Sequence, residues 1–102
     1  MPPTWQDHLD EDRRLVILRL LSECGGTANE GVLRAGLEAL GHRRGLTRDA
    51  VRALLDWLAE RALVSLEYFD DRVAVATLIR RGLDCARGDI EVAGVKKPSI
   101  VG

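Results

Sequence analysis

The chain has 102 residues, of which 46% are hydrophobic and 30% charged, and its formal net charge is −1. This length fits one domain, and the composition is too apolar for a disordered chain. The near-zero net charge excludes a domain-wide basic surface of the kind that binds nucleic acid, but it is compatible with a local basic patch.

The sequence contains neither a recognisable secretory signal nor a membrane span. The N-terminal stretch MPPTWQDHLDED is polar and acidic, without a positive region followed by an apolar one. The longest apolar run, LVILRLL, is interrupted by Arg19 and is shorter than the roughly 20 residues of a transmembrane helix. Cys24 and Cys85 lie far apart, which favours buried hydrophobic roles over a disulfide framework. We therefore expect a cytoplasmic protein without membrane attachment.

Three helices are predicted in the first part of the chain, each carrying apolar residues at helical spacing. Each begins after a residue that caps helices well, Thr4, Asn29 or Thr47, and Asp7 can complete a capping box with Thr4. The predicted helices span about residues 5–23, 30–40 and 48–61.

The hydrophobic period then changes from near four to two. This change predicts strands over about residues 63–68 and 72–78, joined by a turn at Asp70-Asp71. A short helix is expected over residues 80–87, ending at Gly88. Residues 89–102 hold two glycines, a proline and a Lys-Lys pair, which predicts an extended or flexible C-terminal arm. The expected organisation is a domain over residues 1–88 followed by this arm.

This order of elements predicts a mostly helical α+β fold. Three helices with a tight second-to-third connection, followed by a β-hairpin, form the winged helix-turn-helix plan, here with a short C-terminal helix. Because an isolated hairpin is unstable in water, the two-stranded β-wing is expected to pack on the three-helix core.

The segments RRLVILRLLSE, TRDAVRALLDWLAERALV and VAVATLIRRGLDCARG resemble winged-helix transcriptional regulators of the ArsR and MarR type. More narrowly, EDRRLVILRLL, the ALGHR loop, the third helix and the closing VAGVKKPS are similar to small winged-helix proteins of Mu-like prophages, over about residues 9–99. The resemblance implies a regulator in the cytoplasm of a bacterial host. The paired cysteines of ArsR metal sensors are missing here, so metal sensing is not implied.

A DNA-binding protein of this plan places its third helix in the major groove. Arg48 and Arg52 lie four residues apart on one side of that helix and are expected to contact bases, while Arg43 and Arg44 would hold flanking phosphates. Thr47 lies at the helix start, where backbone N–H groups attract phosphate. The partner would be double-stranded DNA. The alternative is a solvated arginine cluster that balances nearby acids.

Two acidic features oppose groove binding. Asp49, Asp56 and Glu60 lie opposite the apolar stripe of the third helix, and Asp70-Asp71 form the wing turn, where carboxylates repel phosphates. The aspartate pair can also be read simply as a turn former. These features motivate the alternative function, a non-catalytic protein-interaction module of phage assembly or DNA packaging with a phage protein as partner.

Two further surfaces are candidates for contacts. Lys96 and Lys97 could follow DNA as a basic arm, or simply solubilise the tail. Trp5 and Leu9 lie outside the dense apolar run of the first helix and are the candidate contacts of a homodimer.

Catalysis finds little support in the sequence. His8 and His42 lack the spacing of metal ligands, and Gly25-Gly26 is not followed by the Lys-Ser/Thr of a phosphate-binding loop. We expect no catalytic residues, no metal site and no cofactor, and therefore no enzyme.

Overall fold

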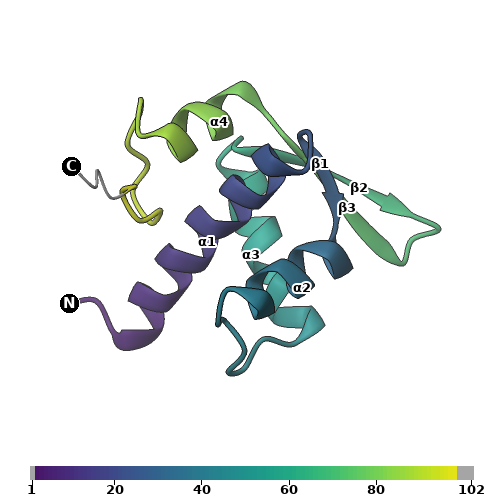
Figure 1. Cartoon of the computed structure of the whole chain (residues 1–102), viewed down its shortest axis with the longest axis horizontal. Helices are drawn as coiled ribbons and strands as arrows, with labels where there is room; N and C mark the ends of the chain where they lie inside the picture. The colour runs from purple at the N-terminus through teal and green to yellow at the C-terminus, as the bar shows by residue number, and fades with distance from the viewer. Residues whose placement is uncertain (1, 99–102) are drawn as a thin grey trace.

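In the computed structural model, which describes residues 2–98, the first helix forms the spine of the fold. α1 (Trp5–Glu23) packs against α2 (Glu30–Ala39) and α3 (Arg48–Glu60) on one side. The short α4 (Arg80–Arg87) lies against its other side (Figure 1). These helices confirm the predicted ones, with α2 and α3 each ending one residue earlier than expected.

Side-chain hydrogen bonds start the three long helices as the sequence predicts. Thr4 Oγ1 accepts the Asp7 N–H at 3.1 Å, and the Asp7 carboxylate accepts the Thr4 N–H at 2.9 Å, which completes the capping box. These bonds lower the pKa of Asp7. Asn29 and Thr47 cap α2 and α3 through their side-chain oxygens.

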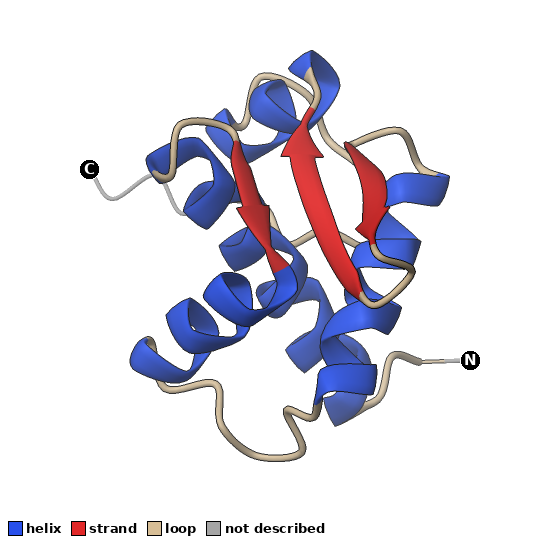
Figure 2. Cartoon of the chain, turned by 90° about the vertical axis from the view of Figure 1, so that its right-hand side faces the viewer, coloured by secondary structure: helices blue, strands red, loops and turns tan. Residues whose placement is uncertain are grey.

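A three-stranded antiparallel sheet packs on the helices (Figure 2). β2 (Val64–Phe69) and β3 (Val73–Leu78) form the expected hairpin, each starting one residue later than predicted. β1 (Thr27–Asn29) was not expected; it pairs with the other edge of β3 and gives the strand order β1-β3-β2. A strand this short has no readable period, because its identity as a strand depends on its distant partner.

The core lies between the sheet and the three long helices. It is built from aliphatic side chains, as the composition predicts: each long helix contributes its apolar stripe, and the sheet adds small residues. The largest fully buried side chains are Ile17, Leu18, Leu21, Leu33, Leu37, Val51, Leu55, Leu58, Leu63 and Val64.

Residues 89–98, expected to be part of an extended or flexible arm, instead lie against the domain. Val95 is 8% exposed, and the Lys96 N–H donates to the Glu11 carbonyl at 3.2 Å. Gly94 lies so close to the Trp57 ring that a Cβ atom there would overlap it, so this contact depends on glycine. The sequence reading missed this docking because its contacts come from α1 and α3. Residues 99–102 lie outside the described part of the chain.

Candidate interaction surface

A buried carboxylate connects α2, α3 and the hairpin. Glu30, the first residue of α2, is 5% exposed. Its side chain accepts hydrogen bonds from Arg48 Nε, from Arg52 Nε at 2.8 Å and from the Ala74 N–H at 3.1 Å. Burial alone would raise the pKa of Glu30, but the bonds from Arg52, Ala74 and Arg48 outweigh it, and the pKa lies below its usual value. Glu30 is therefore ionised at neutral pH.

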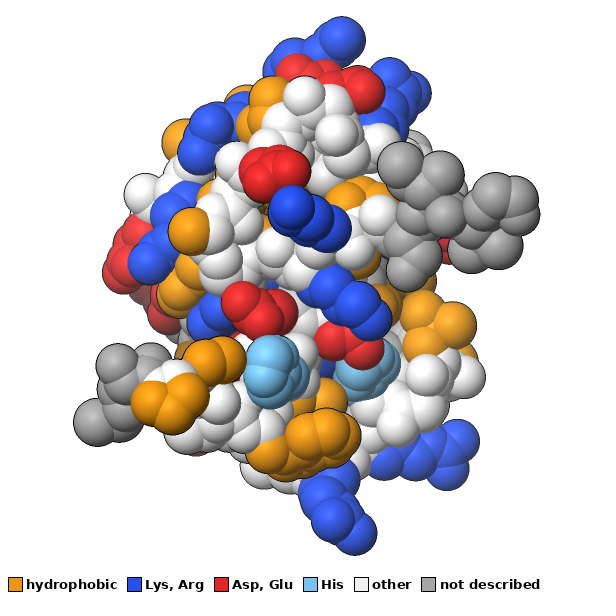
Figure 3. Space-filling view, turned by 90° about the vertical axis from the view of Figure 1, so that its left-hand side faces the viewer, with side chains coloured by type: hydrophobic (Ala, Val, Ile, Leu, Met, Phe, Trp, Pro, Cys, Tyr) orange, Lys and Arg blue, Asp and Glu red, His pale blue; other side chains and the backbone are white. Residues whose placement is uncertain are grey.

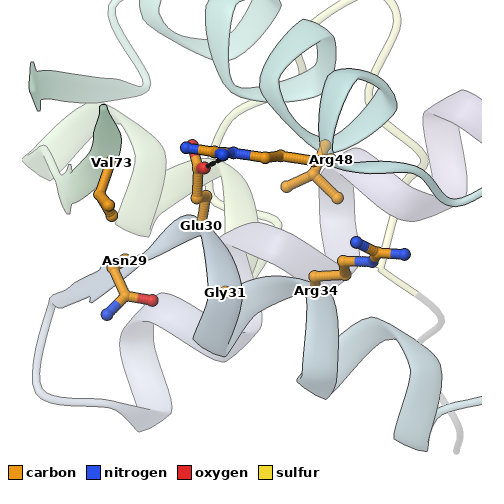
Figure 4. A pocket seen from close by; sticks show the side chains of 7 residues that line it. Asn29, Glu30, Gly31, Arg34, Arg48 and Val73 are labelled. Carbon is orange, nitrogen blue, oxygen red and sulfur yellow. Dashed lines mark hydrogen bonds and ion pairs between the residues drawn. The ribbon is translucent and has the colours of Figure 1, made fainter. Parts of the chain in front are cut away.

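The same two arginines fasten the hairpin. The Nη2 groups of Arg48 and Arg52 both donate to the backbone carbonyl of Arg72, just before β3. Glu30, Arg48, Arg52 and the Arg72 carbonyl together form what we call the Glu30 clamp. The clamp borders a hollow of about 370 Å³ between the starts of α2, α3 and β3, in which Arg34 points away from Glu30 (Figure 4).

The arginines expected to grip DNA do not form one patch. Arg48 and Arg52 turn toward Glu30, whereas Arg43 Nε donates to the Glu38 carbonyl at 3.2 Å, at the end of α2. The Arg44 side chain lies at a different hollow, between α1 and α3. The four arginines predicted to bind DNA therefore lie at three separate places on the molecule. Thr47 caps α3, as expected.

The exposed side of α3 and the hairpin tip carry acidic and aromatic side chains, beside the exposed Arg48 and Arg72. Phe69 is 72% exposed and Tyr68 is 48% exposed, and the Tyr68 hydroxyl donates to Asp56 Oδ1 at 3.4 Å. Asp70 and Asp71 both adopt positive φ angles, 51° and 53°, so they do form the tight turn. We call this region the α3–hairpin surface; its exposed acidic and aromatic residues are Asp49, Asp56, Glu60, Tyr68, Phe69, Asp70 and Asp71.

The two lysines of the expected basic arm have acidic neighbours within the chain. Lys96 Nζ lies 3.8 Å from Asp12 Oδ1, and Lys97 Nζ lies 3.1 Å from Glu91 Oε1. At the end of the molecule that carries the N-terminal half of α1, acidic and basic side chains alternate without an extended area of one sign (Figure 3). The lysines therefore do not create a basic surface there.

Trp5, the expected dimer contact, is 79% exposed at the start of α1. It lines a hollow of about 300 Å³ together with Leu9, which is half-buried, and with Glu11 and Asp12. The indole is thus available for a contact, and the carboxylates of Glu11 and Asp12 beside it have His8 and Lys96 as neighbours.

Within residues 2–98, no group of three His, Cys, Asp or Glu side chains is arranged to hold a metal ion. None of the helices in that range is long and apolar enough to cross a membrane.

Sequence reasoning missed Glu30. An acidic residue in the first turn of a helix is ordinarily explained by the helix dipole. Its partners lie 18, 22 and 44 residues further along the chain. No local pattern indicates that they meet.

The fold and this surface define a small α+β protein in which a buried carboxylate fastens a β-hairpin to a helical core. The chain is 51% identical over 92 residues to the uncharacterized protein gp26 of Escherichia phage Mu, covering 90% of this chain and 93% of that protein. It is also 40% identical over 83 residues to an uncharacterized protein of Haemophilus influenzae, covering 81% and 79% of the two chains. The chain belongs to this family, and the phage Mu relative confirms the expected phage association. No protein-family model and no solved structure matches it.

Proposed function

We propose that the protein is a winged-helix, non-enzymatic interaction module of the phage, and that it binds a protein partner through the α3–hairpin surface. The order α1-β1-α2-α3-β2-β3, with β1 paired to the hairpin, supports the winged-helix assignment. Fold alone does not decide function, so the argument for a protein partner rests on the surface.

The observation that carries this proposal is the state of Arg48 and Arg52. In a DNA-binding winged helix these side chains would point at base edges and phosphates. Here their guanidinium groups are hydrogen-bonded to Glu30 and the Arg72 carbonyl. The acidic side chains that remain on the surface would repel a phosphate backbone.

Exposed aromatic residues favour a protein partner. Tyr and Phe are enriched at the centres of protein interfaces, and Phe69 is far more exposed than a core residue. Carboxylates on both sides of these rings favour a partner surface that carries Lys or Arg around an apolar hollow.

Double-stranded DNA remains the second candidate function, because one observation favours it. The hollow of about 370 Å³ lies at the N-terminal ends of α2 and α3 and is lined by Arg34 and Arg48, an arrangement that attracts phosphate. In this alternative, release of the arginines from Glu30 would accompany binding.

Fluorescence anisotropy with a mixed-sequence duplex separates the two functions. At about 50 mM salt, where electrostatic binding is strong, we expect no binding below about 100 µM protein. Duplex binding that is lost in Arg48→Ala plus Arg52→Ala would establish the DNA function and refute the protein-interaction proposal.

A second experiment tests for the partner directly. Tagged protein is used to capture other proteins encoded by the same prophage, with Asp70→Asn plus Asp71→Asn as the variant. Asparagine tolerates positive φ, so this variant removes charge without straining the turn. We expect the wild type to bind one identifiable phage protein directly, and we expect the variant not to bind it. Equal binding by the variant would contradict the proposal.

A further inference from the structure

A groove between α1 and α3 is complementary in charge to the hairpin tip. The groove has a volume of about 380 Å³ and lies beside the N-terminal half of α1. Ala53 and Leu54 of α3 line its apolar part, and Arg13, Arg14 and Arg44 line its basic part. Asp10 is the single carboxylate of the lining, and it also accepts a hydrogen bond from Gln6 Nε2 at 2.9 Å.

These arginines are poorly compensated. Arg13 is 3% exposed and donates to His42 Nδ1 at 3.4 Å and to the Arg44 carbonyl at 2.8 Å, but within residues 2–98 it has no carboxylate at ion-pair distance. A buried charge without an ionic partner is costly. A carboxylate brought into this groove would therefore be stabilised.

Arg14 also lacks a complete set of hydrogen-bond partners. Its guanidinium lies 3.9 Å from the Trp57 ring centroid, and its Nη1 donates to the Gly94 carbonyl at 2.9 Å. Its buried Nε has no hydrogen-bond partner among the described residues. Burial lowers the pKa of Arg14, although the nearby carboxylates of Asp10, Glu11 and Asp7 act in the opposite direction.

The hairpin tip carries the carboxylates and the exposed aromatic ring that would complement this basic and apolar groove. Phe69 is 72% exposed, and Asp70 and Asp71 follow it directly at the turn. The tip projects from one end of the molecule, whose longest extent is 41 Å, while the N-terminal half of α1 lies toward the other end (Figure 1). One copy therefore presents the tip and the groove in opposite directions.

We propose that the α1–α3 groove of one copy receives the hairpin tip of a second copy. Asp70 and Asp71 would pair with Arg44 and Arg14, and Phe69 would pack against the apolar part of the groove. The contact is head-to-tail, so repetition gives a ring or an open chain. This inference rests on the proposed function, since it names the partner of the same surface.

The alternative two-fold arrangements are less favourable. A pair of hairpin tips would set Asp70 and Asp71 against their own copies, and pairing through Trp5 would bring together two helix starts that each carry Asp7, Asp10 and Glu11. Like charges placed against each other across an interface oppose association. Head-to-tail contact sets the tip carboxylates against one carboxylate, Asp10, and three arginines of the groove lining.

The contact is small, so a weak association is expected. A hairpin tip in one groove buries less than the ~1,200 Å² of a standard interface, the size range in which weak and transient complexes fall. Sedimentation velocity at about 0.5 mM protein and about 50 mM salt, where charge pairing is least screened, should therefore show species larger than a monomer.

Two variants make the test specific. The tip variant carries Phe69→Ala, Asp70→Asn and Asp71→Asn, and the groove variant carries Arg44→Glu. Arg44 has an exposed side chain, so its replacement leaves the core intact. Arg43→Glu, at the neighbouring exposed arginine outside the groove, is the matched control, and circular dichroism checks that every variant is folded.

Mixing the variants gives the decisive result. We expect each variant alone to be monomeric, the Arg43→Glu control to associate like the wild type, and a 1:1 mixture of the two variants to form dimers only. The tip variant then supplies the groove and the groove variant supplies the tip. A monomeric wild type, a mixture that does not associate, or oligomers that persist in both variants would overturn the proposal. A monomeric wild type that still binds a phage protein through Asp70 and Asp71 would leave the proposed function standing.

Discussion

Glu30 is ionised although it is almost fully buried, because Arg48, Arg52 and the Ala74 N–H surround its carboxylate. These two arginines are the pair whose spacing on α3 suggested base recognition. Each hydrogen bond to Glu30 occupies a donor that a guanine or a phosphate would need. One acidic side chain thus changes what the neighbouring helix can bind.

Glu30→Gln should destabilise the protein by about 2 kcal/mol at neutral pH, since it leaves guanidinium donors without a charged acceptor and sets an amide N–H₂ against one of them. Urea unfolding followed by far-UV circular dichroism measures the change. An unfolding free energy equal to that of the wild type would contradict the role given to Glu30.

The free energy of unfolding should depend on pH differently in the wild type and in Glu30→Gln. The pKa of Glu30 is lower in the folded than in the unfolded state, so its stabilising contribution is complete above the unfolded value, near 4.5, and is lost as the pH falls through the folded value. The stability difference between wild type and Glu30→Gln should therefore stay constant from about pH 7 to about pH 5 and shrink as the pH falls further. A stability difference that grows as the pH falls would contradict the lowered pKa of Glu30.

Gly94 holds the segment 89–98 against Trp57. Gly94→Ala should displace that segment, because the added Cβ would overlap the indole ring. Gly41→Ala is the matched control: its φ of 95° is close to the 93° of Gly94, but no atom lies within 4 Å of the added Cβ. Limited proteolysis should cut residues 89–98 faster in Gly94→Ala alone. Equal cleavage in both variants would mean that backbone strain, not the ring contact, explains the effect.

Among the elements, those set by local chemistry were predictable from the sequence. The side-chain oxygens of Thr4, Asn29 and Thr47 cap their helices by accepting the backbone N–H three residues further on, and Asp70-Asp71 form the turn at positive φ. These signals need no knowledge of the rest of the chain.

The elements that depend on distant partners were not predictable. β1 is a strand only because β3 pairs with it across about 50 residues of sequence. The Glu30 clamp joins α2, α3 and the start of β3, and the docking of residues 89–98 depends on α1 and α3. The sequence predicted that Arg48 and Arg52 share one side of α3, but it did not predict their hydrogen bonds to Glu30 and to the Arg72 carbonyl.

The Glu30 clamp couples the hairpin to α3. In Arg48→Ala plus Arg52→Ala, the amide of Ala74 loses the partners that hold its acceptor in place, so its hydrogen exchange should accelerate about tenfold or more. Exchange of the buried α1 amides should change less. Uniform acceleration throughout the protein would indicate global destabilisation instead of a released hairpin.

The exposed Phe69 ring at the hairpin tip is not needed for the stability of the fold. Phe69→Ala should change the free energy of unfolding by less than about 0.5 kcal/mol, because the ring is largely in solvent. Leu58→Ala, at a fully buried position of α3, should cost about 2–5 kcal/mol. Thermal unfolding of both variants makes the comparison; a large loss for Phe69→Ala would assign the ring a structural role.

For the whole molecule, the net charge of −1 conceals an uneven distribution. Acidic residues gather on the α3–hairpin surface, while arginines line the α1–α3 groove at the other end. The α3–hairpin surface and the groove thus differ in charge, which suits contact between two proteins better than contact of this surface with a uniformly negative duplex.

The α3–hairpin surface is proposed to contact protein and not DNA. Amide chemical shifts, recorded while a mixed-sequence duplex is added at about 50 mM salt, test it residue by residue. We expect no shifts along α3 or the hairpin when DNA is added. Saturable shifts running from Arg48 to Asp56 on addition of the duplex would contradict it.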